Sequence, residues 1–253
     1  MDRLDIIRED ETLEDLQING FSVIQKKEGF RFGMDAVLLA NFAKLKKRDE
    51  VVDLCSGTGI IPFVIMAKNS ISKITGVEIQ DEMVEMANRT ARYNNVNDKA
   101  YFVNGDLKDK DLIKTLGKVD VVTVNPPYKL KDSGLINLDD RNSIARHEIC
   151  CTLKDVVEAA SILLKDKGRF YMVHRPERIA DIICEMRSYN IEPKLIKIVH
   201  PSIKKRANLI LIEGQKNGGK FLKWDTALYV YDENGQYTED MNRIYYKRDD
   251  DNE

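Results

Sequence analysis

The chain has 253 residues, of which 43% are hydrophobic and 32% charged, so it is long enough to bury one substantial core. It contains no apolar run of the roughly 18–20 residues that span a bilayer, and its acidic N-terminus does not resemble a signal peptide, so we expect a cytoplasmic protein with no membrane partner. The net charge is −2, but residues 1–15 carry −5 and residues 249–253 carry −4. This leaves +7 for residues 16–248, which is compatible with a nucleic-acid partner.

A hairpin and a short helix are predicted ahead of a longer strand–helix repeat. Residues 16–25 alternate apolar and polar side chains around Asn19-Gly20, a dipeptide typical of tight hairpin turns, and residues 34–43 show a helical pattern. From residue 51 onward, strand patterns alternate with helix patterns. The expected strands are 51–54, 73–79, 100–104, 119–124, 169–174, 191–199 and 208–213, and the expected helices are 60–67, 82–93, 112–116, 153–164 and 176–189.

This alternation predicts an α/β fold with a mostly parallel sheet that helices cover on both faces. Only residues 201–206 separate the last two expected strands, so these strands should pair as an antiparallel hairpin at the sheet edge. We therefore expect a Rossmann-like, mostly parallel seven-stranded sheet with a C-terminal antiparallel hairpin. The expected parts are an extension over residues 1–45, a catalytic domain over residues 46–248 and an acidic tail over residues 249–253.

The four cysteines, Cys55, Cys150, Cys151 and Cys184, contain no Cys-x-x-Cys pair and have no histidine at zinc spacing. We expect neither a disulfide framework nor a metal site. The adjacent Cys150-Cys151 pair precedes an expected helix, where we interpret it as small residues packed against the core, with redox activity as the alternative.

Glycines and an acid follow the first two expected strands, at the edge where open α/β sheets bind ligands. The first strand enters a turn containing Gly57 and Gly59, which lets the backbone approach a ligand closely. Pro62 stands where a dinucleotide fingerprint has its third glycine, so the loop does not reproduce that fingerprint. Glu78 ends the second strand about 20 residues further on, where a carboxylate accepts hydrogen bonds from both ribose hydroxyls. The candidate cofactor residues of the two loops are Asp53, Ser56, Gly57, Gly59 and Glu78.

The fourth strand leads directly into Asn125-Pro126-Pro127-Tyr128. The two prolines fix the backbone, so the Asn125 side chain and the Pro126 carbonyl are aimed rigidly into a site. These two acceptors suit the hydrogens of a planar amino group, whose lone pair is freed for attack when the nitrogen becomes pyramidal. Tyr128 can lie flat on a base. If the second substrate is a sulfonium methyl donor, attack of the nitrogen on its methyl group is an in-line displacement. Such a displacement depends on positioning, so no catalytic histidine is needed.

The order of these motifs resembles the amino-methylating class I methyltransferases. Several longer segments resemble the bacterial tRNA(Val) adenine-N6 methyltransferase family: residues 30–40, 145–148, 171–178, 199–201 and 206–214. The resemblance implies S-adenosyl-L-methionine as cofactor and the N6 of the adenosine next to the anticodon, position 37, as target. Cys55 departs from the pattern, because the usual loop has a glycine there.

The resemblance also implies roles for residues outside the glycine turn. Asp106 would face the adenine amine, and Phe32, Gly33 and Asp35 would help to cover the cofactor, which Asn125 also borders. A stacked tRNA loop must be opened before its base is methylated, so phosphate contacts are expected. The candidate RNA-binding residues are Arg146, His147, Lys204, Lys205 and Arg206.

Three alternatives remain open from the sequence. A protein glutamine methyltransferase acting on a release factor suits the same Asn-Pro-Pro-Tyr loop, but only about 50 residues precede the first strand, which is short for the usual substrate domain. Guanine N2 methylation of ribosomal RNA is a second alternative, and a binding protein without turnover is a third. We expect a monomer that binds tRNA.

Overall fold

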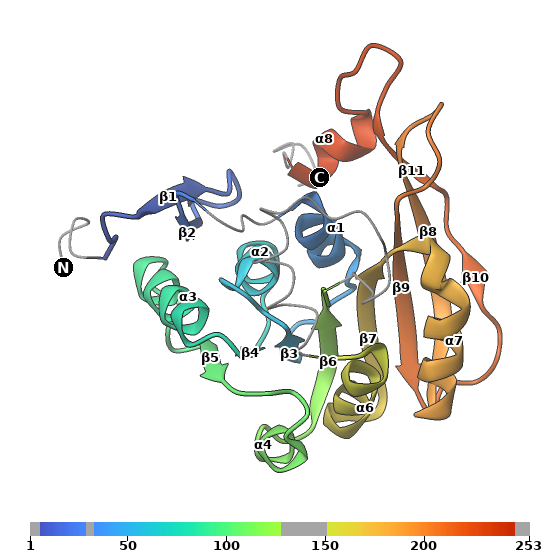
Figure 1. The fold of residues 1–253 in the computed structure, drawn as a ribbon, viewed down its shortest axis with the longest axis horizontal. Helices are drawn as coiled ribbons and strands as arrows, with labels where there is room; N and C mark the ends of the chain where they lie inside the picture. The colour runs from blue at the N-terminus through green and yellow to red at the C-terminus, as the bar shows by residue number, and fades with distance from the viewer. Residues whose placement is uncertain (1–5, 29–32, 128–150, 246–253) are drawn as a thin grey trace, which may run out of the picture.

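The computed structural model describes residues 6–28, 33–127 and 151–245. Seven strands form the centre of its sheet, in the order β5-β4-β3-β6-β7-β9-β8, and only β9 runs antiparallel to its neighbours (Figure 1). Their bounds are β3 (Glu50–Leu54), β4 (Lys73–Glu78), β5 (Ala100–Asn104), β6 (Val119–Val124), β7 (Leu164–His174), β8 (Ile191–Ser202) and β9 (Leu209–Lys216). The predicted mostly parallel sheet with an antiparallel C-terminal hairpin is confirmed. The sheet is larger than the predicted seven strands, because β10 (Lys223–Trp224) and β11 (Leu228–Tyr231) both pair in parallel with β8. The apolar pattern of residues 228–231 predicts a late strand but not its place in the sheet.

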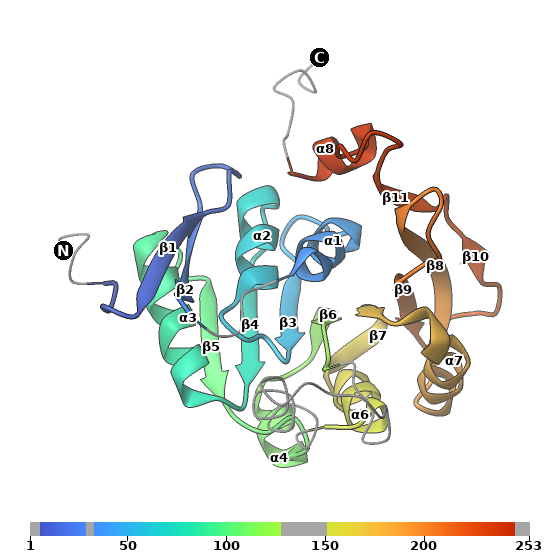
Figure 2. The same cartoon turned by 45° about the horizontal axis from the view of Figure 1, so that its top comes forward.

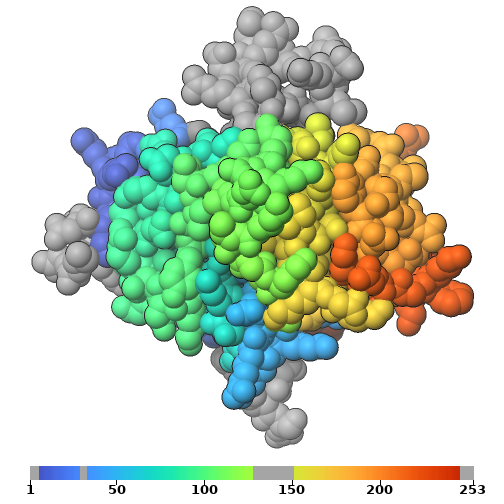
Figure 3. Space-filling view, turned by 90° about the horizontal axis from the view of Figure 1, so that it is seen from below, coloured from blue at the N-terminus to red at the C-terminus, as the bar shows by residue number. Residues whose placement is uncertain are grey.

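Helices cover both faces of the sheet and enclose two apolar cores. One core lies under α1 (Met34–Phe42), α2 (Ile60–Lys68) and α3 (Asp81–Tyr93). The other lies under α4 (Lys110–Thr115), α6 (Leu153–Leu163) and α7 (Ile179–Ser188), on the opposite side of the sheet (Figure 2). Seen from below, the segments coloured green, yellow and orange lie side by side across the molecule, in the order of the chain (Figure 3).

The N-terminal hairpin forms, but its first strand lies earlier than predicted. β1 (Glu11–Asp15) pairs with β2 (Ser22–Lys26), and the turn occupies residues 16–21. The Glu11 carboxylate accepts two hydrogen bonds from the Arg89 guanidinium on α3, at 2.6 and 2.7 Å, and both side chains are buried. This ion pair fixes β1 against α3. The alternating pattern of residues 16–25 could not reveal it, because Glu11 lies outside that range.

Several element ends also differ from the predicted ones. The predicted helix 176–189 begins as a 3₁₀ turn, η2 (Pro176–Arg178), and α7 follows from Ile179. β7 begins at Leu164 and not at residue 169, since its first residue pairs with Val119 of β6 across a bulge. The C-terminal helix α8 (Glu239–Tyr245) was not predicted; it packs against β11 through the buried Met241.

The parallel strands bring their following loops to one edge of the sheet. The registers place the last residues of β3 and β4 beside those of β6 and β5, respectively. Gly76 lies inside β4, and a β carbon there would lie 2.5 Å from the hydroxyl of Ser56. The missing side chain therefore lets the loop after β3 fold closely over β4.

Candidate functional site

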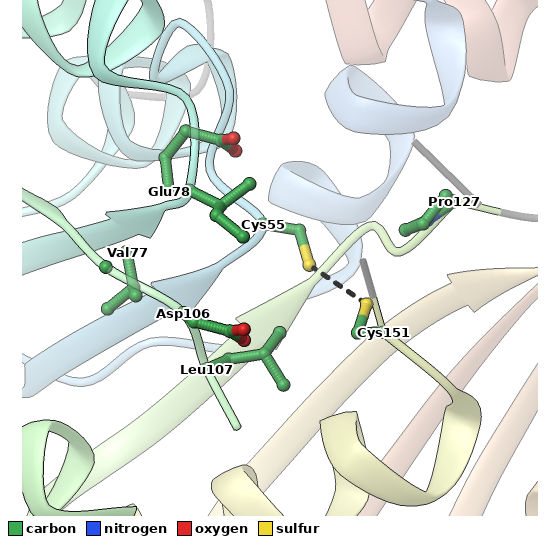
Figure 4. Close-up of a pocket in the computed structure, with 9 residues that line it drawn as sticks. Cys55, Val77, Glu78, Asp106, Leu107, Pro127 and Cys151 are labelled. Atoms are coloured by element: carbon green, nitrogen blue, oxygen red, sulfur yellow. Dashed lines mark hydrogen bonds between the residues drawn. The ribbon is translucent and has the colours of Figure 1, made fainter. Parts of the chain in front are cut away.

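An open pocket lies at the carboxyl ends of β3, β4, β5 and β6 (Figure 4). It is lined by Cys55, Val77, Glu78, Ile79, Gly105, Asp106, Leu107, Pro127 and Cys151. These residues come from the ends of four different strands and from the segment before α6. Two carboxylates among apolar side chains are a composition typical of small-molecule sites.

The glycine loop, residues 55–59, takes its shape from left-handed backbone conformations. Gly57 and Gly59 have φ angles of 54° and 85°, and a β carbon on Gly59 would lie 2.7 Å from the ring of Phe102. The Gly57 N–H donates to Glu78 Oε2 at 2.9 Å, which ties the loop to the end of β4. Gly59 is the N-cap of α2, and its N–H donates to the Ser56 carbonyl at 2.9 Å, so the loop is closed by its own backbone beside the pocket residue Cys55.

Glu78 is held by backbone donors but keeps acceptor capacity. Its Oε1 accepts a hydrogen bond from the N–H of Gln80 at 3.0 Å, and its Oε2 accepts the one from Gly57. Each carboxylate oxygen has a second lone pair. The Gln80 side-chain amide also donates to Oε1, at 3.4 Å, so Oε2 keeps a free acceptor position and Oε1 gains one where this long contact is displaced.

Beneath the glycine loop lies a buried acid with an unpaired oxygen. Asp53 is 0% exposed, and its Oδ1 accepts a hydrogen bond from Thr123 Oγ1 at 2.6 Å. Burial raises the pKa of Asp53 to about 7 against the opposing effect of the Thr123 hydrogen bond. Asp53 Oδ2 has no partner within hydrogen-bond distance, and the buried Ser56 hydroxyl lies near enough to lower the pKa of Asp53.

The other end of the pocket suits a flat ring that carries an amino group. Ile79 is 42% exposed although it is large and apolar, and Leu107 lies buried across the pocket. The Asp106 carboxylate accepts from the Lys108 N–H at 2.9 Å through Oδ1, which fixes its direction. Ile79 was not identified from the sequence; its signal was an apolar residue directly after the acid that ends β4.

The Asn-Pro-Pro segment directly follows β6, which ends at Val124. Pro126 is buried, Asn125 and Pro127 are half-buried, and Pro127 lines the pocket. The predicted target loop and the predicted cofactor acids therefore share one pocket. Tyr128 lies outside the described residues.

A contact between two cysteines in the pocket was not identified from the sequence. Cys55 Sγ and Cys151 Sγ lie 4.0 Å apart, and the two side chains point toward one another near Pro127 (Figure 4). The free cysteines that the structure describes are Cys55, Cys151 and Cys184. The contact joins residues 96 positions apart, so only the fold brings them together.

Other candidate residues lie elsewhere. Gly33 and Asp35 stand at the start of α1 and are not among the described residues that line the pocket. The basic tripeptide 204–206 is exposed in the loop between β8 and β9. β8 runs in the direction of β6, so this loop leaves the same sheet edge as the Asn-Pro-Pro segment. Phe32, Arg146 and His147 lie outside the described residues.

None of the helices among the described residues combines the length and hydropathy of a membrane span. No group of three or more His, Cys, Asp or Glu side chains gathers in the described ranges as a metal site would.

The profile of the methyltransferase small domain matches residues 32–186, which include every segment of the pocket. The chain belongs to this methyltransferase family. S-adenosyl-L-methionine is its cofactor.

Two curated relatives and one solved structure resemble this methyltransferase. The tRNA1(Val) (adenine(37)-N6)-methyltransferase of Porphyromonas gingivalis is 26% identical over 199 residues, which are 76% of this chain and 77% of the relative. The Flavobacterium psychrophilum protein of the same name is 24% identical over 216 residues, 83% of this chain and 91% of the relative. The crystal structure of a predicted O-methyltransferase, Atu636 from Agrobacterium tumefaciens, superposes with a TM-score of 0.68 at 21% identity, covering 84% of this chain and 95% of that protein. At that identity the structural likeness shows the fold alone.

Proposed function

We propose that this methyltransferase transfers a methyl group from S-adenosylmethionine to the exocyclic N6 of an adenosine in tRNA, the nucleoside next to the anticodon. The observation that carries the proposal is that Pro127, of the Asn-Pro-Pro segment, lines the same pocket as Glu78 and Asp106. An amino group held by that segment would therefore lie beside the cofactor. The names of the two curated relatives specify this reaction, at adenine 37 of a tRNA(Val).

The pocket residues have separate tasks in holding the cofactor, which supplies a methyl group activated by a positively charged sulfur. Glu78 accepts hydrogen bonds from the two ribose hydroxyls, and Asp106 accepts from the adenine amino group. Ile79 and Leu107 cover the faces of the adenine ring, which removes the exposed surface of Ile79 from water.

The glycine loop and the segment before α1 would provide the remaining contacts with the cofactor. The glycine loop, which Glu78 holds through the Gly57 N–H above the buried Asp53, would border the remaining polar groups of the cofactor. By resemblance, Phe32, Gly33 and Asp35 cover the cofactor from the N-terminal side.

The target adenine is bound by acceptors and by stacking. Asn125 Oδ1 and the Pro126 carbonyl each accept one hydrogen of the N6 amino group, which favours a pyramidal nitrogen whose lone pair is free to attack. Tyr128 stacks on the base and holds the nitrogen in line with the methyl group. Because the reaction depends on alignment, the proton on nitrogen needs no strong base before attack.

The tRNA would lie along the carboxyl edge of the sheet. Lys204, Lys205 and Arg206 are exposed at this edge and would contact phosphates, with Arg146 and His147 as further contacts. Because this substrate is cytoplasmic, we propose that the methyltransferase works in the cytoplasm, as a monomer. The division into an extension (1–45), a catalytic domain (46–248) and an acidic tail (249–253) belongs to the same proposal.

Transfer of labelled methyl from S-adenosylmethionine to total unmodified tRNA tests the reaction. We expect N6-methyladenosine in the hydrolysed product of the wild type and at least about a hundredfold lower rate for Asn125→Ala, since loss of one positioned hydrogen-bonding group typically costs that much. Asn234→Ala changes an exposed asparagine in the β11–α8 loop and serves as the matched control with a wild-type rate. Label in a release factor or in guanosine of ribosomal RNA, with none in tRNA, would overturn the substrate assignment.

A further inference from the structure

Two thiols meet in the wall of the cofactor pocket. Cys55 begins the glycine loop and Cys151 precedes α6, and their sulfur atoms lie 4.0 Å apart. Both side chains line the pocket, so a small reagent that enters it can reach them. Cys184, by contrast, is exposed on α7, away from this contact.

The backbone fixes both members of the pair. Cys55 has a φ angle of 56°, a left-handed conformation that costs a side-chain-bearing residue about 1–2 kcal/mol. Cys151 directly precedes a capping box: Thr152 Oγ1 accepts from the Asp155 N–H at 3.3 Å, and Asp155 Oδ2 accepts from the Thr152 N–H at 2.8 Å. The backbone that carries each cysteine is therefore held in a defined conformation.

The two thiols differ in acidity. A hydrogen bond from the Cys55 thiol lowers the pKa of Cys151, and the same contact together with burial raises the pKa of Cys55. The thiolate is the nucleophile in thiol–disulfide exchange. At a separation of 4.0 Å, either thiol is close enough to resolve a mixed disulfide that forms on the other.

We propose that Cys55 and Cys151 form a reversible disulfide that weakens cofactor binding. The oxidant is a low-molecular-weight disulfide. The thiolate of one cysteine attacks one sulfur atom of the small disulfide and displaces one thiolate, which leaves a mixed disulfide on that cysteine. The other cysteine then loses its proton and attacks the sulfur of the first cysteine, and the second small thiolate leaves. In total, two protein thiols and one small disulfide become one protein disulfide and two small thiols.

The bond would alter the pocket at its loop. A disulfide holds its sulfur atoms about 2.05 Å apart, so the pair must close by about 2 Å from its present separation. This movement draws the start of α6 toward the glycine loop, next to Gly57, whose N–H is bound by Glu78. The effect on binding rests on the assigned cofactor, whereas formation of the bond does not.

Peptide mapping and cofactor titration of the same samples test the proposal. Wild-type protein is incubated with oxidised glutathione or with excess dithiothreitol, digested without reduction, and mapped by mass spectrometry. We expect a peptide pair joined through Cys55 and Cys151 only after oxidation. Titration with S-adenosylhomocysteine should show affinity about tenfold or more weaker in the oxidised sample, restored by dithiothreitol.

Variants separate this pair from the other cysteines. The ratio of the reduced and oxidised affinities should fall to one in Cys151→Ser and in Cys55→Gly, which restores the usual glycine. It should persist in Cys150→Ser and Cys184→Ser. A map without the Cys55–Cys151 link, or a link with unchanged affinity, would overturn the proposal. If reduced wild type binds no cofactor analogue, the cofactor assignment fails, and the map still decides whether the disulfide forms.

Discussion

The buried carboxyl of Asp53 should make the stability of the fold depend on pH. Its folded pKa is about 7, raised by burial from the value of 3.8 of a free aspartate. Between these two values the folded state holds a proton that the unfolded state releases, so the free energy of unfolding falls as pH rises. A shift of about three units corresponds to about 4 kcal/mol at alkaline pH, of which about 2.5 kcal/mol is lost between pH 5 and pH 8.

Asp53→Asn should remove this dependence. Asparagine keeps the shape and the acceptor for Thr123 but stays neutral. The difference in unfolding free energy, variant minus wild type, should therefore rise by about 2.5 kcal/mol from pH 5 to pH 8. Urea denaturation at four pH values in that range measures it for both proteins.

A companion substitution sharpens this test. Thr123→Val removes a hydrogen bond that lowers the pKa of Asp53, so its stability should go on falling above pH 7. A difference in unfolding free energy between Asp53→Asn and wild type that stays constant from pH 5 to pH 8 would contradict the raised pKa, because Asp53 would then be ionised throughout this range.

Three further predictions concern the cofactor acid, the hairpin and the RNA surface. Glu78→Gln should weaken binding of S-adenosylhomocysteine about 30-fold by calorimetry, because its hydrogen bonds lose the carboxylate charge. Arg89→Ala should lower the free energy of unfolding by about 3–5 kcal/mol in urea, since it leaves the buried Glu11 carboxylate unpaired. The double variant Lys204→Glu, Lys205→Glu should weaken tRNA binding and flatten its dependence on salt in filter-binding assays.

Each of these predictions has a contradicting outcome. Wild-type affinity in Glu78→Gln would remove the ribose role, and a loss below about 1 kcal/mol in Arg89→Ala would show that the hairpin contact is solvated. An unchanged salt slope in the double variant would exclude the β8–β9 loop from the RNA surface.

The sheet was predictable because its signals are local. Short apolar runs ending in Leu54, Glu78 and Val124 alternate with helical patterns, and parallel pairing follows from that alternation. The pairing of the added edge strands was not predictable in this way. β10 has only two residues, which is too short for a recognisable strand pattern, and its pairing with the outer strand β8 joins distant parts of the sequence. The start of β1 depends on Glu11 meeting Arg89 on a helix 78 residues away.

The same distinction between local signals and contacts made only by the fold applies to the site. Glu78, Asp106 and Pro127 could be placed in one pocket from the sequence, because each follows a strand of one parallel sheet. The contact between Cys55 and Cys151 could not, because nothing in the spacing of the two cysteines indicates it. The acidity of Asp53 also needs the structure, since burial causes it.

The most direct test of the proposed reaction uses one tRNA and one changed base. Unmodified tRNA(Val) transcript with adenosine at position 37, the position in the names of the relatives, is compared with a transcript carrying guanosine there. After incubation with the protein and S-adenosylmethionine, mass spectrometry of nuclease fragments locates the methyl group. We expect one methyl group on N6 of adenosine 37 and no methylation of the guanosine transcript. Equal methylation of both transcripts, or a methyl group at another nucleoside, would contradict it.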